Sequence, residues 1–137
     1  MELKNWLKRH SIVNYWFPVY VYAAIIFYIS SLRFGPLPSN IWVQGLDLFD
    51  PKRVILHVIE YSGLGYLLYR GFINSDRKLF YENAFLLAIL FGLFYGITDE
   101  MHQALVPTRE MSLYDIFSDG LGTTIGAVIP FRNNKKL

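Results

Sequence analysis

The sequence contains no cysteine, which excludes disulfide bonds, thiolate metal ligands and cysteine nucleophiles. It is also poor in charge, because charged residues make up 18% of the chain, below the roughly one quarter typical of soluble proteins. The net charge is only +2, and the basic residues are scattered between apolar segments, which argues against a nucleic-acid partner. No Gly-x-Ser-x-Gly, phosphate-loop or His-Glu-x-x-His motif is present, so no common catalytic motif identifies an enzyme.

Apolar residues are abundant instead, at 53% of the chain, and aromatic residues reach 18%. A chain of 137 residues has room for one domain, which we place at residues 1–137. Four apolar segments each have about the twenty residues that a helix needs to cross a bilayer. The first also exceeds the ~7–15 apolar residues of a signal peptide. We therefore predict an all-α, four-helix transmembrane bundle with spans at about 13–32, 54–73, 83–103 and 112–131.

Lysine and arginine are distributed unevenly around these spans. Nine of the 13 lie in the N-terminal segment, the second loop and the C-terminal segment, and four lie in the first and third loops. Since positive charge favours the cytoplasmic side, both termini are predicted to be cytoplasmic. The first loop, residues 33–53, and the third loop, which carries Arg109, are then external.

Ionisable residues converge on the outer third of the predicted bundle. Glu60 lies ~9 Å below the outer end of the second span, and Asp119 lies ~10 Å below that of the fourth. Asp99 lies near the outer end of the third span, and His57 lies one turn from Glu60. Because lone charges inside a membrane are costly, we expect these groups to line a polar cavity.

Helical spacing sorts the residues of the third span. Asp99, His102 and Gln103 share one face, whereas Glu100 is turned ~100° away. The neighbouring Arg109 is either a ligand-binding cation or a structural one, reaching toward water or pairing with Asp99 or Glu100.

The fourth span brings two carboxylates onto one face, since Asp115 and Asp119 are four residues apart and repel each other. Either a cation lies between them, or one stays protonated; the sequence does not distinguish these alternatives. Ser112 is placed as a helix cap, which leaves open a purely structural role for Asp115 at the positive helix end. The same helix carries Ser118, Gly122 and Gly126 at four-residue spacing, a pattern of close helix packing. We interpret it as packing inside the bundle, with a homodimer as the alternative.

The motifs of the last three spans resemble the VanZ-like family of small bacterial membrane proteins. The resemblance rests on Lys52-Arg53-x-x-x-His57-x-x-Glu60-Tyr61, on Tyr95-x-x-x-Asp99-Glu100-x-His102-Gln103 through Pro107-x-Arg109, and on Ser112-x-x-Asp115-x-x-x-Asp119-x-x-Gly122-x-x-x-Gly126. Family members commonly carry asparagine where this chain has Asp119. The resemblance implies a multi-pass protein of the bacterial plasma (inner) membrane. It also implies a role in the cell envelope linked to resistance to teicoplanin, a lipoglycopeptide antibiotic.

Two functions fit these residues. In the first, the outer cavity binds a membrane lipid, a lipid-linked cell-wall precursor or the lipoglycopeptide, with Lys52, Arg53 and Arg109 on phosphate and the remaining polar residues on sugars or amines. That ligand-binding set is Lys52, Arg53, His57, Glu60, Tyr61, Gln103, Arg109, Ser112, Asp115 and Asp119. In the second, the protein is an enzyme on a lipid phosphoester or glycosyl lipid, with Asp99, Glu100 and His102 as catalytic residues. A divalent metal held among Asp99, Glu100, His102 and Asp119 would be its cofactor.

Overall fold

The protein is all-helical over the residues that its computed structural model describes, which are 2–32, 51–107, 109 and 111–134. The helices are α1 (Glu2–Ser31), α2 (Pro51–Ile73), α3 (Lys78–Glu82), α4 (Ala84–Gln103) and α5 (Leu113–Asn134). No strand occurs in these ranges, so the predicted all-α class is confirmed. Most of the predicted first loop, residues 33–50, lies outside the described residues.

Helix positions agree with the four predicted spans, with two differences. α1 begins at Glu2 rather than near residue 13, and the short α3 precedes α4. Two segments are long and apolar enough to cross a membrane by themselves, Val13–Ser31 and Ala84–Gln103. Membrane crossing by each of the four long helices, and the cytoplasmic placement of the termini, stay predictions.

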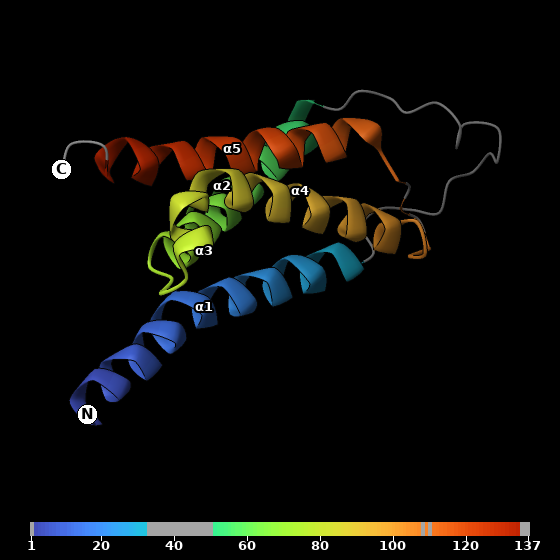
Figure 1. Cartoon of the computed structure of the whole chain (residues 1–137). Coiled ribbons are helices and arrows are strands. Elements are labelled where there is room, and N and C mark those ends of the chain that lie inside the picture. Colours follow the sequence, from blue (N-terminus) through green and yellow to red (C-terminus); the bar gives the residue numbers. More distant parts are fainter. Residues whose placement is uncertain (1, 33–50, 108, 110, 135–137) are drawn as a thin grey trace, which may run out of the picture.

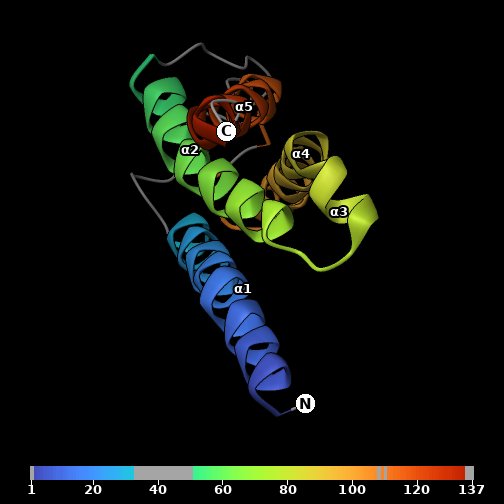
Figure 2. The ribbon, with the colours of Figure 1, turned by 60° about the vertical axis from the view of Figure 1, so that its left-hand side comes forward.

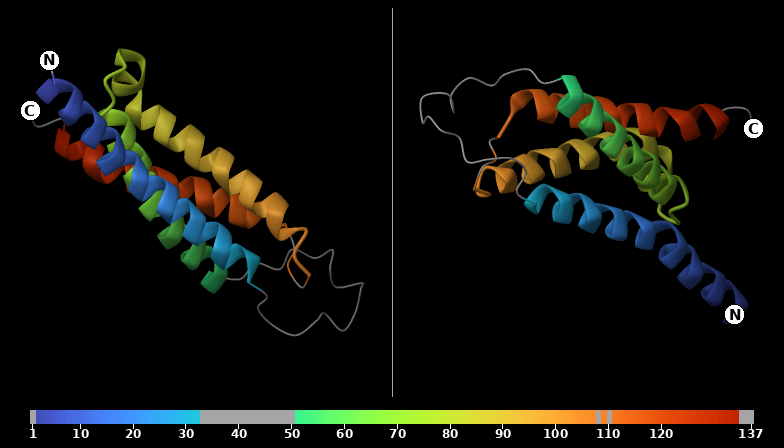
Figure 3. Two further views of the ribbon diagram at one scale, coloured as in Figure 1. Left: turned by 90° about the horizontal axis from the view of Figure 1, so that it is seen from below. Right: turned by 180° about the vertical axis from the view of Figure 1, so that it is seen from behind.

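The central helix is α2, which packs against α1, α4 and α5. Figures 1 and 2 show α1 on the side of α2 and α4 that faces away from α5. The long helices alternate in direction, so the start of α1 and the end of α5 lie at the same end of the bundle (Figure 3). The junction between α4 and α5 and the start of α2 lie at the opposite end, where the sequence concentrates its ionisable residues.

The closest contact in the bundle joins α2 to α5 through glycine. A Cβ atom at Gly122 would lie 3.0 Å from the Cα atom of Val58, and one at Gly126 would overlap the backbone of Ser62. Ser118 completes the stripe and is buried. The prediction that this stripe packs inside the bundle is therefore confirmed. α2 covers the glycine face of α5 through which a homodimer would have formed. This approach brings the polar residues of the two helices together.

The outer surface of the bundle is apolar. On α5, large apolar side chains are exposed at every fourth position: Leu113, Phe117, Leu121, Ile125 and Ile129. The buried residues of the same helix include Asp115, Ser118, Asp119 and Thr123. A helix with polar groups inside and apolar groups outside matches a lipid solvent rather than water.

Two tyrosine hydroxyls attach α1 to the rest of the bundle. The Tyr22 hydroxyl donates a hydrogen bond to the backbone carbonyl of Glu60 at 3.0 Å. The Tyr95 hydroxyl donates to the carbonyl of Ala23 at 2.6 Å. From these contacts to its C-terminal end, α1 forms one wall of a cavity.

Candidate functional site

A cavity of about 780 Å³ lies at the end of the bundle where α2 begins and α4 ends. Its volume is within the ~300–1,000 Å³ of typical small-molecule sites. Its apolar wall comes from α1 and α2, and several of these side chains are themselves exposed on the outer surface: Ile25, Ile29, Leu56 and Ile59. The cavity therefore has an apolar rim that is continuous with the apolar outer surface.

The remainder of the lining is polar and comes mainly from α2, from α4 and from Arg109, which follows α4. α2 contributes His57 and Glu60, and α4 contributes Asp99 and Gln103. The Gln103 amide donates a hydrogen bond to Asp99 Oδ2 at 2.9 Å, while Asp99 Oδ1 is buried without a hydrogen-bond partner among the described residues. This part of the lining offers both charged acceptors and neutral donors to a ligand.

Three cations line the same cavity: Lys52, Arg53 and Arg109. Arg109 follows α4 and is half-buried; burial, together with the nearby charge of Arg53, lowers the pKa of its guanidinium. The carboxylates of Asp99, Glu100 and Glu60 act in the opposite direction. An arginine stays protonated across the physiological range, so the cavity keeps at least this positive charge.

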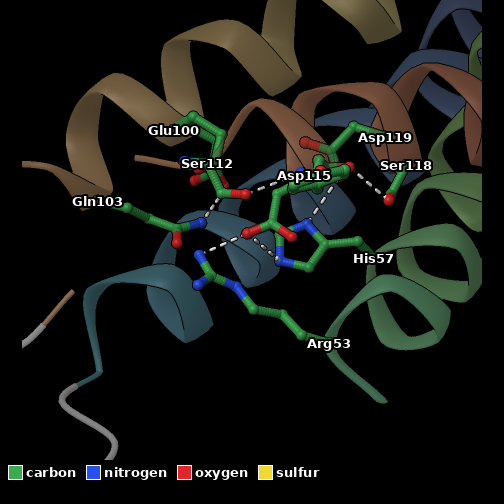
Figure 4. A network of polar contacts seen from close by, with 10 residues as sticks. Arg53, His57, Glu100, Gln103, Ser112, Asp115, Ser118 and Asp119 are labelled. Atoms are coloured by element: carbon green, nitrogen blue, oxygen red, sulfur yellow. Dashed lines mark hydrogen bonds and ion pairs between the residues drawn. The ribbon is translucent and has the colours of Figure 1, made fainter. Parts of the chain in front are cut away.

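Behind the cavity, His57 joins a buried polar cluster between α2 and α5 (Figure 4). Its Nδ1 atom lies 2.8 Å from Asp119 Oδ1, and its Nε2 atom lies 3.8 Å from Asp115 Oδ2. Arg53 forms an ion pair with the same Asp115 carboxylate. Since His57 and Arg53 also line the cavity, the two sites share these side chains.

Glu100 extends this cluster from α4. Its Oε2 atom accepts a hydrogen bond of 2.9 Å from the backbone N–H of Ser112, just before α5. The Ser112 hydroxyl accepts a bond of 3.3 Å from the N–H of Asp115, as predicted for a helix cap. Asp115 is more than a favourable charge at the helix start, because it also pairs with Arg53. Glu100 Oε1 and Asp119 Oδ2 are buried with no hydrogen-bond partner among the described side chains.

Two of the predicted site residues lie elsewhere. His102 points toward α1, where its Nε2 atom is 3.0 Å from the Ser31 hydroxyl and its ring stacks on Phe27. Tyr61 is fully buried in the core, with its ring centroid 6.4 Å from that of His57, and does not line the cavity. The structure thus brings together Glu100 and Asp119 from the predicted metal candidates, joined by His57 instead of His102.

Nothing in the sequence indicates that α1 contributes to the cavity. Tyr22, Ile25 and Ser30 line it, yet they belong to the one span without a motif. Their apolar and weakly polar types are common in any membrane helix, so only the packing of α1 reveals them.

Comparison with known proteins identifies one family. A family model described as VanZ/LLP1 matches residues 5–132, nearly the whole chain. No individual curated protein and no solved structure gives a significant match.

Proposed function

Because the chain belongs to the VanZ/LLP1 family, we propose that it is a multi-pass protein of the bacterial plasma membrane that binds a lipid or lipid-linked cell-wall headgroup in its cavity. The observation that carries this proposal is the cavity itself, which combines a cationic and polar lining with an apolar rim. Such a site fits an amphiphile whose headgroup is anionic and whose chains stay in the bilayer.

The inverted distribution of polarity supports four membrane spans. α1 and α4 are apolar enough to cross a membrane on overall composition. α5 has a lower mean hydropathy because its buried face carries carboxylates and hydroxyls, while its exposed face is a continuous apolar stripe. Carboxylates buried between helices are compatible with a membrane span when they face the bundle interior. With four spans and termini at one end, both termini lie on the same side of the membrane.

The cations at the cavity would hold the phosphate of the headgroup. Arg109 and Arg53 are suited to this, since a guanidinium donates two parallel hydrogen bonds to one phosphate. Both arginines line the cavity, and we choose Arg109 for the test because replacing it leaves the ion pair between Arg53 and the buried Asp115 intact. Lys52, exposed at the start of α2, would add a point charge.

The acidic residues deeper in the cavity would recognise the remainder of the headgroup. Glu60 and Asp99 can accept hydrogen bonds from sugar hydroxyls or from an ammonium group, and Gln103 provides an amide. The exposed rim residues Ile25 and Ile59 lie where acyl or polyprenyl chains would leave the cavity toward lipid. Binding of a cell-wall lipid in this cavity would lower the capture of that lipid by a lipoglycopeptide such as teicoplanin. The protein would contribute to resistance in this way.

The test is lipid binding measured by native mass spectrometry on the full chain in a neutral detergent, titrated with phosphatidylglycerol or phosphatidylcholine. The wild-type protein should retain the anionic lipid more tightly. Arg109→Gln should weaken phosphatidylglycerol binding at least about tenfold, because hydrogen bonds to charged groups contribute ~1.5–3 kcal/mol. Lys78→Gln is the matched control, since Lys78 is 85% exposed on α3, away from the cavity. Equal loss in the two variants, or no preference for the anionic lipid, contradicts the proposal.

A second candidate function is acid–base catalysis on a lipid phosphoester or glycosyl lipid. The observation that favours it is the 2.8 Å contact of His57 with Asp119, because a histidine oriented by a carboxylate is a common general base. His57 also lines the cavity, where a substrate would lie. If the protein turns over such a lipid, Asp119→Asn should lower kcat sharply while leaving lipid binding intact. If neither a lipid phosphoester nor a glycosyl lipid is turned over, the catalytic function is contradicted and lipid binding remains the proposed function.

A further inference from the structure

Two buried carboxylates in the cluster each use one oxygen and leave the other without a hydrogen-bond partner among the described residues. Glu100 and Asp119 are both 0% exposed. Glu100 Oε2 accepts from the Ser112 backbone and Asp119 Oδ1 contacts His57, while Glu100 Oε1 and Asp119 Oδ2 have no hydrogen bond to any residue that the structure describes. A buried oxygen of this kind is costly unless a donor or a cation reaches it.

Carboxylates also outnumber the arginine in the cluster of Figure 4. Three carboxylates lie in it, those of Glu100, Asp115 and Asp119, and Arg53 forms an ion pair with Asp115. If Glu100 and Asp119 are both ionised and His57 is neutral, the two carboxylates carry two negative charges inside the bundle. One divalent cation supplies the two positive charges that would compensate them.

We propose that His57, Glu100 and Asp119 bind one divalent cation, of the type of Zn²⁺ or Mn²⁺. Each residue offers one ligand atom, and the three atoms lie within 4.8 Å of one another. A neutral imidazole with two carboxylates is a ligand set that these ions accept, whereas Ca²⁺ and Mg²⁺ prefer oxygen ligands alone. Three protein ligands leave at least one coordination position for water or another group.

The surroundings hold these ligands in place. The backbone of Ser112 fixes Glu100, and the close α2–α5 contact at Gly122 sets the approach of His57 to Asp119. His57 lines the cavity as well, so the ion would lie next to the headgroup site. The metal site does not depend on the headgroup proposal, because its ligands all belong to the protein.

The experiment is metal titration of the full chain, purified in detergent and stripped with a chelator. Binding of MnCl2 is followed by the electron paramagnetic resonance signal of free Mn²⁺, and ZnCl2 is added as a competitor. We expect one ion per chain, displaced by Zn²⁺, and a rise in the Tm on binding. Asp119→Asn and His57→Gln should each weaken binding by more than ~100-fold, since even outer-shell partners of metal ligands change affinity by about 10–100-fold.

A matched control is His102→Gln, the same substitution at a histidine that faces Phe27 and Ser31 instead of the cluster. It should bind the ion as the wild type does. Absence of saturable binding to the wild type, or binding that survives both Asp119→Asn and His57→Gln, overturns the site. If a variant does not fold, spin-echo detection of a histidine nitrogen bound to Mn²⁺ in the wild-type protein decides, and its absence also overturns the site. Arg109→Gln should leave metal binding unchanged, which separates this result from the lipid test.

Discussion

Substituting Gly126 by alanine should destabilise the protein, because α2 leaves no room for a Cβ atom at that position. The added carbon would lie 2.9 Å from the Cα atom of Ser62 and would overlap the carbonyl oxygen of the same residue. These are backbone atoms of a neighbouring helix, so they move only if α2 and α5 separate. Overpacking of this kind costs about 1–3 kcal/mol, and the higher helix propensity of alanine returns up to ~1 kcal/mol.

We therefore expect Gly126→Ala to lower the free energy of unfolding by ~1–2 kcal/mol, measured by denaturant-induced unfolding in detergent micelles. Gly120 provides a control on the same helix, because a Cβ there would meet only the Leu93 Cδ1 atom, at 3.3 Å. That atom ends a flexible side chain, so Gly120→Ala should be at least as stable as the wild type, with a gain of up to ~1 kcal/mol from the same helix propensity. If Gly126→Ala is as stable as Gly120→Ala, the α2–α5 contact is not as described, and the contact between His57 and Asp119 loses its basis.

Two further predictions concern the contacts that surround the cavity. Arg53→Gln should destabilise the fold by ~1–3 kcal/mol, more than Lys52→Gln does, because Arg53 forms an ion pair with the buried Asp115 carboxylate whereas Lys52 is exposed at the start of α2; equal unfolding free energies would contradict this. Tyr95→Phe should cost about 1 kcal/mol and loosen α1, because it removes the hydroxyl that donates to the Ala23 carbonyl. Compared with the wild type, amide hydrogen exchange in this variant should become faster in α1 but not in α5. An equal change in all helices would contradict the prediction.

The helices were predictable because the apolar runs are long and their ends carry polar residues. The predicted third span, 83–103, and the observed α4, Ala84–Gln103, differ by one residue. The start of α1 was not predictable, because the bilayer argument counts only the apolar part of a helix and says nothing about a polar extension. α3 has five residues, too few to give a periodic pattern.

The convergence of ionisable groups at one end was also predictable, since it follows from helical rise alone. The rotation of each helix was not. Counting residues placed His102 on the face of Asp99 and Gln103, but in the bundle Asp99 and Gln103 line the cavity while His102 contacts α1. A three-residue separation spreads side chains ~60° around a helix, enough for neighbouring helices to receive different members of one face.

The repulsion between Asp115 and Asp119 now has a more specific answer than the sequence allowed. Arg53 pairs with Asp115, so that carboxylate needs neither a proton nor a metal ion to be compensated. The open question moves to Asp119 and Glu100, which come from different helices and meet beside His57. In that position, protonation would supply hydrogen atoms to the unpaired oxygens, whereas a divalent cation would bind both carboxylates and the imidazole together. Compensation by a cation requires His57 as a ligand, whereas compensation by protons does not. Comparing His57→Gln with His102→Gln therefore distinguishes a bound cation from protonated carboxylates.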